Sequence, residues 1–210
     1  MIYLDSAIAT EASQAMSWGW VKGITTNPTL LAKSETKPAA TLQTLANVTD
    51  GELYYQLVSQ TVDDMIREAH IAKDLIGGKL VLKIPATATG FEALPKLSSE
   101  ISCSVTAIYH PTQALIAAEG GAKYAIAYVN RATRLQGDGC ELVRNMKAIL
   151  QGSETTILAA SLKSPAEISA AMLAGADHIT IPFELLKAMT THSLSEKTVK
   201  DFTASGQGLI

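Results

Sequence analysis

The fold of this chain is decided by the stretch TVDDMIREAHIAKDLIGGKLVLKIP, residues 61–85. Its first part carries apolar side chains at helical spacing along one stripe, and Gly77-Gly78 ends the predicted helix. The run Leu80-Val81-Leu82 that follows is apolar without alternation, which is typical of a parallel strand covered by helices. The stretch therefore predicts a surface helix followed by a buried parallel strand.

The same alternation of strand and helix recurs along the whole chain. Eight strands are predicted, at IYLD (2–5), VKGITT (21–26), ELYYQL (52–57), KLVLKIP (79–85), EISCSVTA (100–107), KYAIAYVN (123–130), TTILAAS (155–161) and HITIP (178–182). This pattern predicts an α/β fold, a single-domain (β/α)8 TIM barrel. An open doubly wound sheet fits less well, because it holds five or six strands and often a GxGxxG turn, which is missing here.

The ends of the helices and of the chain add detail to this prediction. Asn27 is expected to cap the helix that begins at Pro28. The barrel is predicted to occupy residues 1–192, and residues 193–210 a C-terminal helix and tail. That last segment is either a frayed terminus or an arm that packs on a neighbouring subunit.

Composition excludes several classes of function. The 210 residues are 47% hydrophobic and 18% charged, and the net charge is 17 − 20 = −3 with no basic run, so no nucleic-acid partner is expected. No apolar run approaches the roughly 18 residues of a membrane span, and we expect a cytoplasmic protein. Cys103 and Cys140 are expected to be buried thiols, and neither they nor the four histidines show the spacing of a metal site.

Polar residues at the carboxyl ends of the strands are the candidate site, because barrel enzymes build their active sites there. Lys83 is the sharpest candidate, since it follows three apolar residues and precedes Ile84-Pro85. Desolvation of its amine would lower its pKa and supply a neutral nucleophile for a carbonyl group. The alternative is a lysine whose stem packs in the barrel while its head reaches the rim.

A second cluster of polar residues combines Arg131, Ser161 and Lys163, two cations and a hydroxyl from adjacent strand ends. This combination predicts a phosphate pocket, in which the guanidinium makes bidentate contacts. Alternatively, the two cations pair with surface acids. An imine-forming lysine beside a phosphate site indicates a phosphorylated ketose or aldose as substrate.

Several segments carry a family resemblance. They are YLD (3–5), GITTNPTLL (23–31), LVLKIPATATG (80–90), TAIY (106–109), AYVNR (127–131), LAASLKSP (158–165) and AGADHITIP (174–182). In order and over nearly the whole chain, they resemble the transaldolase family and, within it, the small fructose-6-phosphate aldolase-like branch. The resemblance implies a metal-free class I enzyme on a (β/α)8 barrel, with no cofactor.

The resemblance also implies roles for individual residues. Lys83 would form a Schiff base with the donor ketone, and Asp5 would hold the donor and position the amine. Gln56 and Thr106 would bind the water that takes part in proton transfer, and Tyr128 would pass protons to and from the hydroxyl where the carbon–carbon bond breaks. The residues expected to bind substrate are Thr25, Asn27, Asn130, Arg131, Ser161 and Lys163, with the last three at the phosphate.

Gln56 and Tyr128 bear on which branch the chain resembles. Transaldolases resemble one another in having Glu and Phe at these two positions, whereas the aldolase branch has Gln and Tyr. A phenol beside the imine can protonate the enamine and release free dihydroxyacetone, whereas Phe cannot donate a proton. This favours a fructose-6-phosphate aldolase; the alternatives are a transaldolase that transfers the dihydroxyacetone unit, and a non-catalytic sugar-phosphate-binding barrel. The resemblance further implies a homo-oligomer, a decamer of two pentamers, with the C-terminal segment reaching a neighbour.

Overall fold

The computed structural model describes residues 1–209, and its strands form a closed barrel in chain order, which confirms the predicted TIM barrel. The strands are β1 (Ile2–Asp5), β2 (Val21–Thr25), β3 (Glu52–Gln56), β4 (Leu80–Pro85), β5 (Ser102–Ile108), β6 (Tyr124–Tyr128), β7 (Thr156–Ala160) and β8 (His178–Ile181). All neighbouring strands are parallel, and β1 pairs with β8 to close the barrel. All carboxyl ends therefore meet at one rim.

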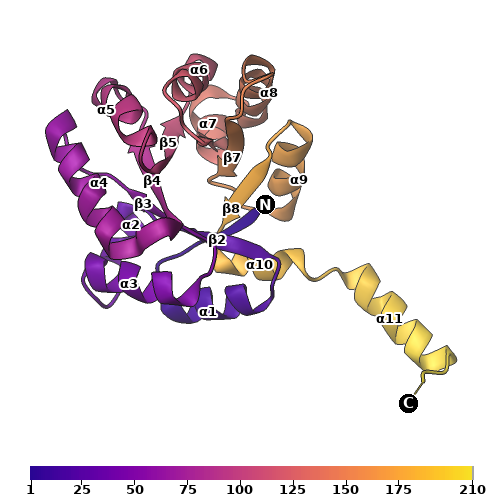
Figure 1. Ribbon diagram of the computed structural model, residues 1–210. Coiled ribbons are helices and arrows are strands. Elements are labelled where there is room, and N and C mark those ends of the chain that lie inside the picture. Colours follow the sequence, from indigo (N-terminus) through magenta and orange to yellow (C-terminus); the bar gives the residue numbers. More distant parts are fainter. Residues whose placement is uncertain (210) are drawn as a thin grey trace.

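Helices surround the strands on the outside (Figure 1). They are α1 (Ala9–Ser17), α2 (Pro28–Ala32), α3 (Pro38–Val48), α4 (Val62–Ile76), the 3-10 turn η1 (Gly77–Lys79), α5 (Ala88–Ser98), α6 (Pro111–Glu119), α7 (Val129–Gln136), α8 (Gly139–Ile149), α9 (Pro165–Leu173), α10 (Phe183–Met189) and α11 (Ser193–Ser205). Asn27 caps α2 as predicted, since its side chain accepts from Leu30 N at 3.0 Å. Gly77 ends α4 with a φ of 73°, which suits a glycine.

The structure corrects some predicted boundaries. The strand predicted over 123–130 ends at Tyr128, because Val129 begins α7 and places Asn130 and Arg131 in a helical first turn. A short strand that runs directly into a helix leaves no turn signal between them. Cys103 is buried as expected, but Cys140, near the start of α8, is only half-buried.

Residues two apart along the strands point into the barrel and stack in layers, as the pleat requires. The middle of the interior is apolar, with Val81 of β4, Ile126 of β6 and Leu158 of β7 in one buried cluster. Lys83 and Tyr128 follow Val81 and Ile126 by two residues, so they lie on the same inner face toward the carboxyl rim. The apolar layer thus separates the polar groups of the two barrel ends.

The amino-terminal end of the barrel holds a buried polar cluster around Glu52. Its carboxylate accepts hydrogen bonds from the hydroxyls of Tyr3 (2.7 Å), Tyr54 (3.0 Å) and Tyr124 (2.9 Å), and from Lys123 Nζ (2.7 Å). Burial opposes ionisation of Glu52, but hydrogen bonds from Lys123, Tyr3 and Tyr124 outweigh it and hold the pKa of the carboxyl below its ordinary value. This end of the barrel is filled by side chains whose polar groups bond to one another.

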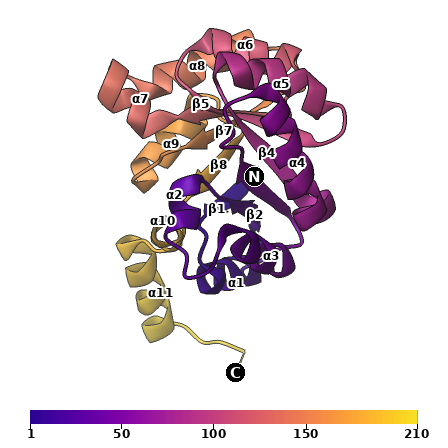
Figure 2. The same ribbon diagram turned by 90° about the vertical axis from the view of Figure 1, so that its left-hand side faces the viewer.

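Helix α11 lies apart from the barrel. Figures 1 and 2 both show it extending away from the other helices, and none of its residues is buried. Its apolar side chains Leu194, Val199 and Phe202 are 66%, 62% and 69% exposed. Residue 210, the last of the predicted tail, lies outside the described residues. No helix in the described part of the chain is long and apolar enough to cross a membrane.

Candidate active site

Lys83 lies inside the barrel near the carboxyl end of β4, with only 4% of its surface exposed. Its Nζ donates to the main-chain oxygen of Thr26 at 2.8 Å. Burial lowers the pKa of the Lys83 amine, and the nearby Asp5 carboxylate opposes that shift. A lysine held in this way reaches the neutral form, which adds to carbonyl groups, at a lower pH than an exposed lysine does.

Asp5, at the end of β1, faces the same interior and is held by Thr25, which in turn contacts a second threonine. Thr25 Oγ1 donates to Asp5 Oδ1 at 2.8 Å and lies 2.6 Å from Thr180 Oγ1 of β8. Burial raises the pKa of the Asp5 carboxyl, and the charge of Lys83, the hydrogen bond from Thr25 and the charge of Lys163 each oppose the rise. The structure thus joins Asp5 to Lys83 electrostatically and uses Thr25 to orient the carboxylate.

The same rim carries three further predicted residues, Gln56 of β3, Thr106 of β5 and Tyr128 of β6. Gln56 pairs in register with Lys83 across β3 and β4, so both side chains point inward. Its Oε1 is buried and receives no hydrogen bond from any residue in 1–209. Thr106, fully buried in β5, donates to Tyr128 Oη at 3.2 Å. A buried acceptor without a protein donor is a place for a water or a substrate hydroxyl.

The predicted phosphate residues lie at the ends of β6 and β7. The Arg131 guanidinium carbon lies 4.9 Å from the centre of the Tyr128 ring, which ties the cation to the rim. Ser161 has a φ of 60°, a left-handed conformation that is uncommon for a residue other than glycine. Lys163 is exposed, and its charge acts on Asp5. Two cations and a hydroxyl therefore border the mouth that contains Lys83.

The two predicted asparagines are already engaged in the protein. Asn27 uses its side-chain oxygen for the α2 cap. Asn130 donates from its amide to Glu167 Oε1 at 2.7 Å, and its main-chain N–H donates to Ser161 O at 3.1 Å. Asn130 thus connects the β6 and β7 ends of the rim.

Comparison with known proteins assigns the family. The transaldolase/fructose-6-phosphate aldolase family matches residues 2–208. The chain belongs to this family. A protein of Hydrogenobaculum sp. named probable transaldolase is 37% identical over 203 residues, which are 95% of this chain and 93% of that protein. A probable transaldolase of Aquifex aeolicus is 36% identical over 203 residues, again 95% and 93% of the two chains.

Solved structures with the same fold include a mandelate oxidase variant, with a TM-score of 0.61 and 13% identity over 87% of this chain. Inosine 5′-monophosphate dehydrogenase from Legionella pneumophila gives a TM-score of 0.63 at 13% identity over 88% of this chain. The present chain covers 64% of the mandelate oxidase chain and 58% of the dehydrogenase chain. At such identities the likeness shows the barrel fold alone.

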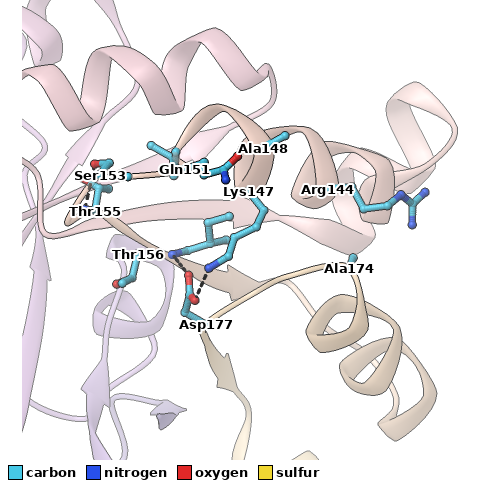
Figure 3. Close-up of a pocket in the computed structure, with 12 residues that line it drawn as sticks. Arg144, Lys147, Ala148, Gln151, Ser153, Thr155, Thr156, Ala174 and Asp177 are labelled. Atoms are coloured by element: carbon cyan, nitrogen blue, oxygen red, sulfur yellow. Dashed lines mark hydrogen bonds and ion pairs between the residues drawn. The ribbon is translucent and has the colours of Figure 1, made fainter.

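Figure 3 shows a surface cavity of about 620 Å³ beside the amino-terminal end of β7. None of its lining residues belongs to the predicted site. Its cations are paired, since Lys147 Nζ lies 2.5 Å from Asp177 Oδ1 and Arg144 pairs with Asp138. Residues 1–209 contain no group of three or more His, Cys, Asp or Glu side chains that could hold a metal ion.

Three contributors to the site of this family member are absent from the sequence-based prediction. The carbonyl of Thr26 holds the amine through a main-chain atom, which residue type does not reveal. Thr180 of β8 supports Thr25 of β2 across β1, which lies between those strands, and its signal is a polar residue between two isoleucines. Glu167 joins the first turn of α7 to the loop after β7, and its signal is the pattern Ser164-Pro165-Ala166-Glu167, which is typical of a helix start.

Proposed function

We propose that this chain is a class I aldolase that cleaves fructose 6-phosphate to dihydroxyacetone and glyceraldehyde 3-phosphate through an imine on Lys83. The observation that carries the proposal is the buried Lys83 amine of lowered pKa beside Asp5. The amine adds to the ketone carbon and loses water to form the imine. The imine is protonated and accepts electrons. A proton then leaves the C4 hydroxyl, the C3–C4 bond breaks to release the aldehyde, and the electron pair of that bond moves toward the protonated imine to give the enamine.

The choice of aldolase over transferase rests on Gln56 and Tyr128. The Tyr128 hydroxyl is fixed by Thr106 at 3.2 Å, at the same rim as the buried Gln56 Oε1. A phenol in this position takes the C4 hydroxyl proton as it passes its own proton to a water bound by Gln56 and Thr106, and that water gives a proton to the enamine carbon. Hydrolysis of the resulting imine releases dihydroxyacetone. These groups support release of the product in place of waiting for an acceptor.

Asp5, Asn27 and the phosphate residues complete the proposed site. Asp5, oriented by Thr25, would hold a donor hydroxyl, and Asn27 would contribute its amide nitrogen while its oxygen caps α2. Arg131, Ser161 and Lys163 would bind the phosphate at the opposite end of the sugar. We expect the enzyme to act in the cytoplasm, where charged sugar phosphates are made and retained.

A transaldolase is the second candidate, and the names of the relatives favour it. The proteins of Hydrogenobaculum and Aquifex, 37% and 36% identical to this chain, are both named probable transaldolase. In that function the enamine on Lys83 attacks an acceptor aldehyde, such as erythrose 4-phosphate, and free dihydroxyacetone is not formed. Both candidates share the imine and differ only in the fate of the enamine.

The imine is tested by borohydride reduction in the presence of dihydroxyacetone, followed by peptide mass spectrometry. Wild type should carry one reduced adduct on Lys83, and Lys83→Met should carry none. Lys96→Met is the matched control, because Lys96 is exposed on α5 and pairs with Glu92 one turn away. This variant should label like wild type. An adduct on another lysine would contradict the mechanism, and no adduct in wild type would favour a non-catalytic binding barrel.

The fate of the enamine is tested by product analysis. Wild type should release dihydroxyacetone from fructose 6-phosphate without an acceptor, and Gln56→Glu with Tyr128→Phe should shift the ratio of products toward transfer when erythrose 4-phosphate is supplied. Transfer without release in wild type would establish the transaldolase in its place.

The exposed helix α11 supports a homo-oligomer. Its side chains Leu194, Val199 and Phe202 are 66%, 62% and 69% exposed, and packing them on a neighbour would bury them. We expect a decamer of two pentamers. Removal of residues 193–210 should lower the particle mass measured by light scattering, and an unchanged mass would contradict a role for the helix in assembly.

A further inference from the structure

Two segments bring the proposed phosphate residues together, and a ring of hydrogen bonds joins them. The first turn of α7, directly after β6, carries Asn130 and Arg131, and the loop after β7 carries Ser161 and Lys163. Asn130 N–H donates to Ser161 O at 3.1 Å, and the Asn130 amide donates to Glu167 Oε1 at 2.7 Å. Lys163 N–H donates to Glu167 Oε2 at 2.8 Å, which closes the ring.

Glu167 departs from the ordinary behaviour of a residue at its position. It is the third residue of α9, and Ser164 caps that helix by accepting from Glu167 N at 3.2 Å. In the usual arrangement, such a glutamate reaches back to the main-chain N–H of the cap residue itself. Here one carboxylate oxygen bonds one residue further back, to Lys163, and the other accepts from Asn130 in the first turn of α7. The side chain therefore connects the loop after β7 to another helix.

We propose that Glu167 is a positioning residue for the phosphate end of the site, acting through the main chain of Lys163 and the amide of Asn130. This rests on the proposed function, because it assigns phosphate to Arg131, Ser161 and Lys163. Ser161 is anchored through its main-chain oxygen and has a left-handed conformation, which persists only where surrounding contacts fix it. The ring fixes the segment from Ser161 to Lys163 on both sides.

The charge of Glu167 makes the proposal distinguishable from a simple electrostatic effect. A carboxylate beside a phosphate site repels the phosphate. If charge alone mattered, Glu167→Gln would bind phosphate more tightly. If Glu167 positions the first turn of α7 and the loop after β7, Glu167→Gln should bind phosphate less tightly. The reason is that a glutamine offers one oxygen acceptor where the N–H groups of two residues must be satisfied.

The experiment compares phosphorylated and unphosphorylated substrates. For Glu167→Gln we expect KM for fructose 6-phosphate to rise by about tenfold, with kcat within about twofold of wild type. The dissociation constant of inorganic phosphate, measured by calorimetry, should rise by a similar factor. The aldol addition of dihydroxyacetone to unphosphorylated glyceraldehyde should be unchanged. Glu184→Gln is the control, because Glu184 lies in the first turn of α10, is 79% exposed and pairs only with Lys187.

A paired exchange tests the ring directly. Asn130→Asp alone places two carboxylates against each other, so phosphate affinity should fall further than in Glu167→Gln. Combining Asn130→Asp with Glu167→Gln lets the glutamine amide donate to the new aspartate while its oxygen still accepts from Lys163 N–H. The net charge equals that of wild type, and we expect phosphate affinity to recover to within about threefold of wild type.

Three results would overturn the proposal. They are unchanged or tighter phosphate binding by Glu167→Gln, equal losses with phosphorylated and unphosphorylated substrates, and a double variant that binds no better than the single ones. If Glu167→Gln does not fold, as judged by its thermal melt, the double variant alone decides. Borohydride trapping on Lys83 separates the two proposals: its absence in wild type contradicts the proposed function, while the phosphate titrations still test Glu167.

Discussion

Polar groups lie at both ends of the barrel interior, but the two ends differ in whether these groups have hydrogen-bond partners within the protein. At the amino-terminal end, the Glu52 carboxylate accepts hydrogen bonds from three tyrosine hydroxyls and the Lys123 ammonium. At the carboxyl-terminal end, Gln56 Oε1 has no donor among residues 1–209, and Lys83 bonds only a main-chain carbonyl. The first end is complete within the protein, whereas the second leaves polar groups for a ligand.

The backbone shows the same contrast. The non-glycine residues with a φ near 60° in the described chain are Ala107 and Ser161, and both lie at the carboxyl-terminal end, next to Thr106 and at the end of β7. A left-handed conformation costs an L-residue roughly 1–2 kcal/mol. Satisfied hydrogen bonds and relaxed backbone thus lie at one end, and unsatisfied groups and strained backbone at the other. This difference teaches that stability and chemistry are separated along the barrel axis.

The largest effect should come from Lys83→Met, which breaks the reactive end without breaking the fold. We expect turnover to fall by at least about 10⁴-fold, as when a covalent nucleophile is removed. The thermal midpoint should stay the same or rise, because an apolar side chain of similar length replaces a buried amine. Turnover assays and thermal melts on the same preparation measure both. A parallel loss of activity and stability would contradict the separation of the two ends.

Glu52→Ala is the complementary change, because it disrupts the hydrogen-bonded amino-terminal end of the barrel. It leaves three tyrosine hydroxyls and the half-exposed Lys123 without their acceptor, so the free energy of unfolding should fall by about 1–3 kcal/mol. Urea unfolding measures this loss, and Glu184→Ala, at an exposed ion pair, should change it by less than about 1 kcal/mol. Turnover per folded molecule should be close to wild type. A large drop in that turnover would show that the two ends are coupled.

The pH dependence of imine formation tests the pair at the reactive end. The Asp5 carboxylate raises the pKa of Lys83 against the lowering by burial. Asp5→Asn removes that charge, so the amine should lose its proton at a lower pH. The acid limb of the rate of imine trapping should therefore move to lower pH, even if the plateau rate falls. Asp50→Asn, at a fully exposed carboxylate, should leave the limb in place, and a shift of the Asp5→Asn limb to higher pH would contradict the assignment.

The smallest effect should come from Ala107→Gly, which relaxes the strained backbone. Glycine adopts a φ of 60° without a steric cost, but it loses more conformational entropy on folding, so the net gain in stability should be no more than about 1 kcal/mol. Ala125→Gly in β6 is the matched control. That residue is fully buried with no positive φ, so the same change should destabilise the protein. Equal losses in both variants would show that Ala107 carries no strain.

Much of the fold follows from the sequence because its signals are local. The α4 stripe, the glycine stop and the apolar β4 run each lie within a few residues, and a parallel pattern repeated eight times leaves few alternatives to a barrel. The end of β6 could not be found in this way. Tyr128 and Val129 are both good strand residues, and the change to helix at Val129 depends on contacts made after the barrel closes.

The candidate site likewise contains residues that could be predicted from sequence and residues that could not. Lys83, Asp5 and Gln56 could be grouped from sequence because the carboxyl ends of parallel strands converge on one rim. The residues that support these groups could not be found from sequence. Thr180 of β8 meets Thr25 of β2 across β1, and Glu167 of α9 meets Asn130 of α7, so both contacts need the three-dimensional register that residue spacing does not supply. The sequence predicts which residues lie at the rim, and the structure shows what holds them there.

The pairing of β1 with β8 has a consequence for synthesis on the ribosome. Ile2 pairs with Ile179 and Leu4 with Ile181, so the first strand waits for almost the whole chain before its second neighbour is made. Until then the growing sheet has two open edges, and exposed edges invite pairing with other chains. Closure also joins residues far apart in sequence, a contact that forms slowly. The interval between β1 and β8 is therefore when a nascent chain most needs protection from aggregation, for example by a chaperone.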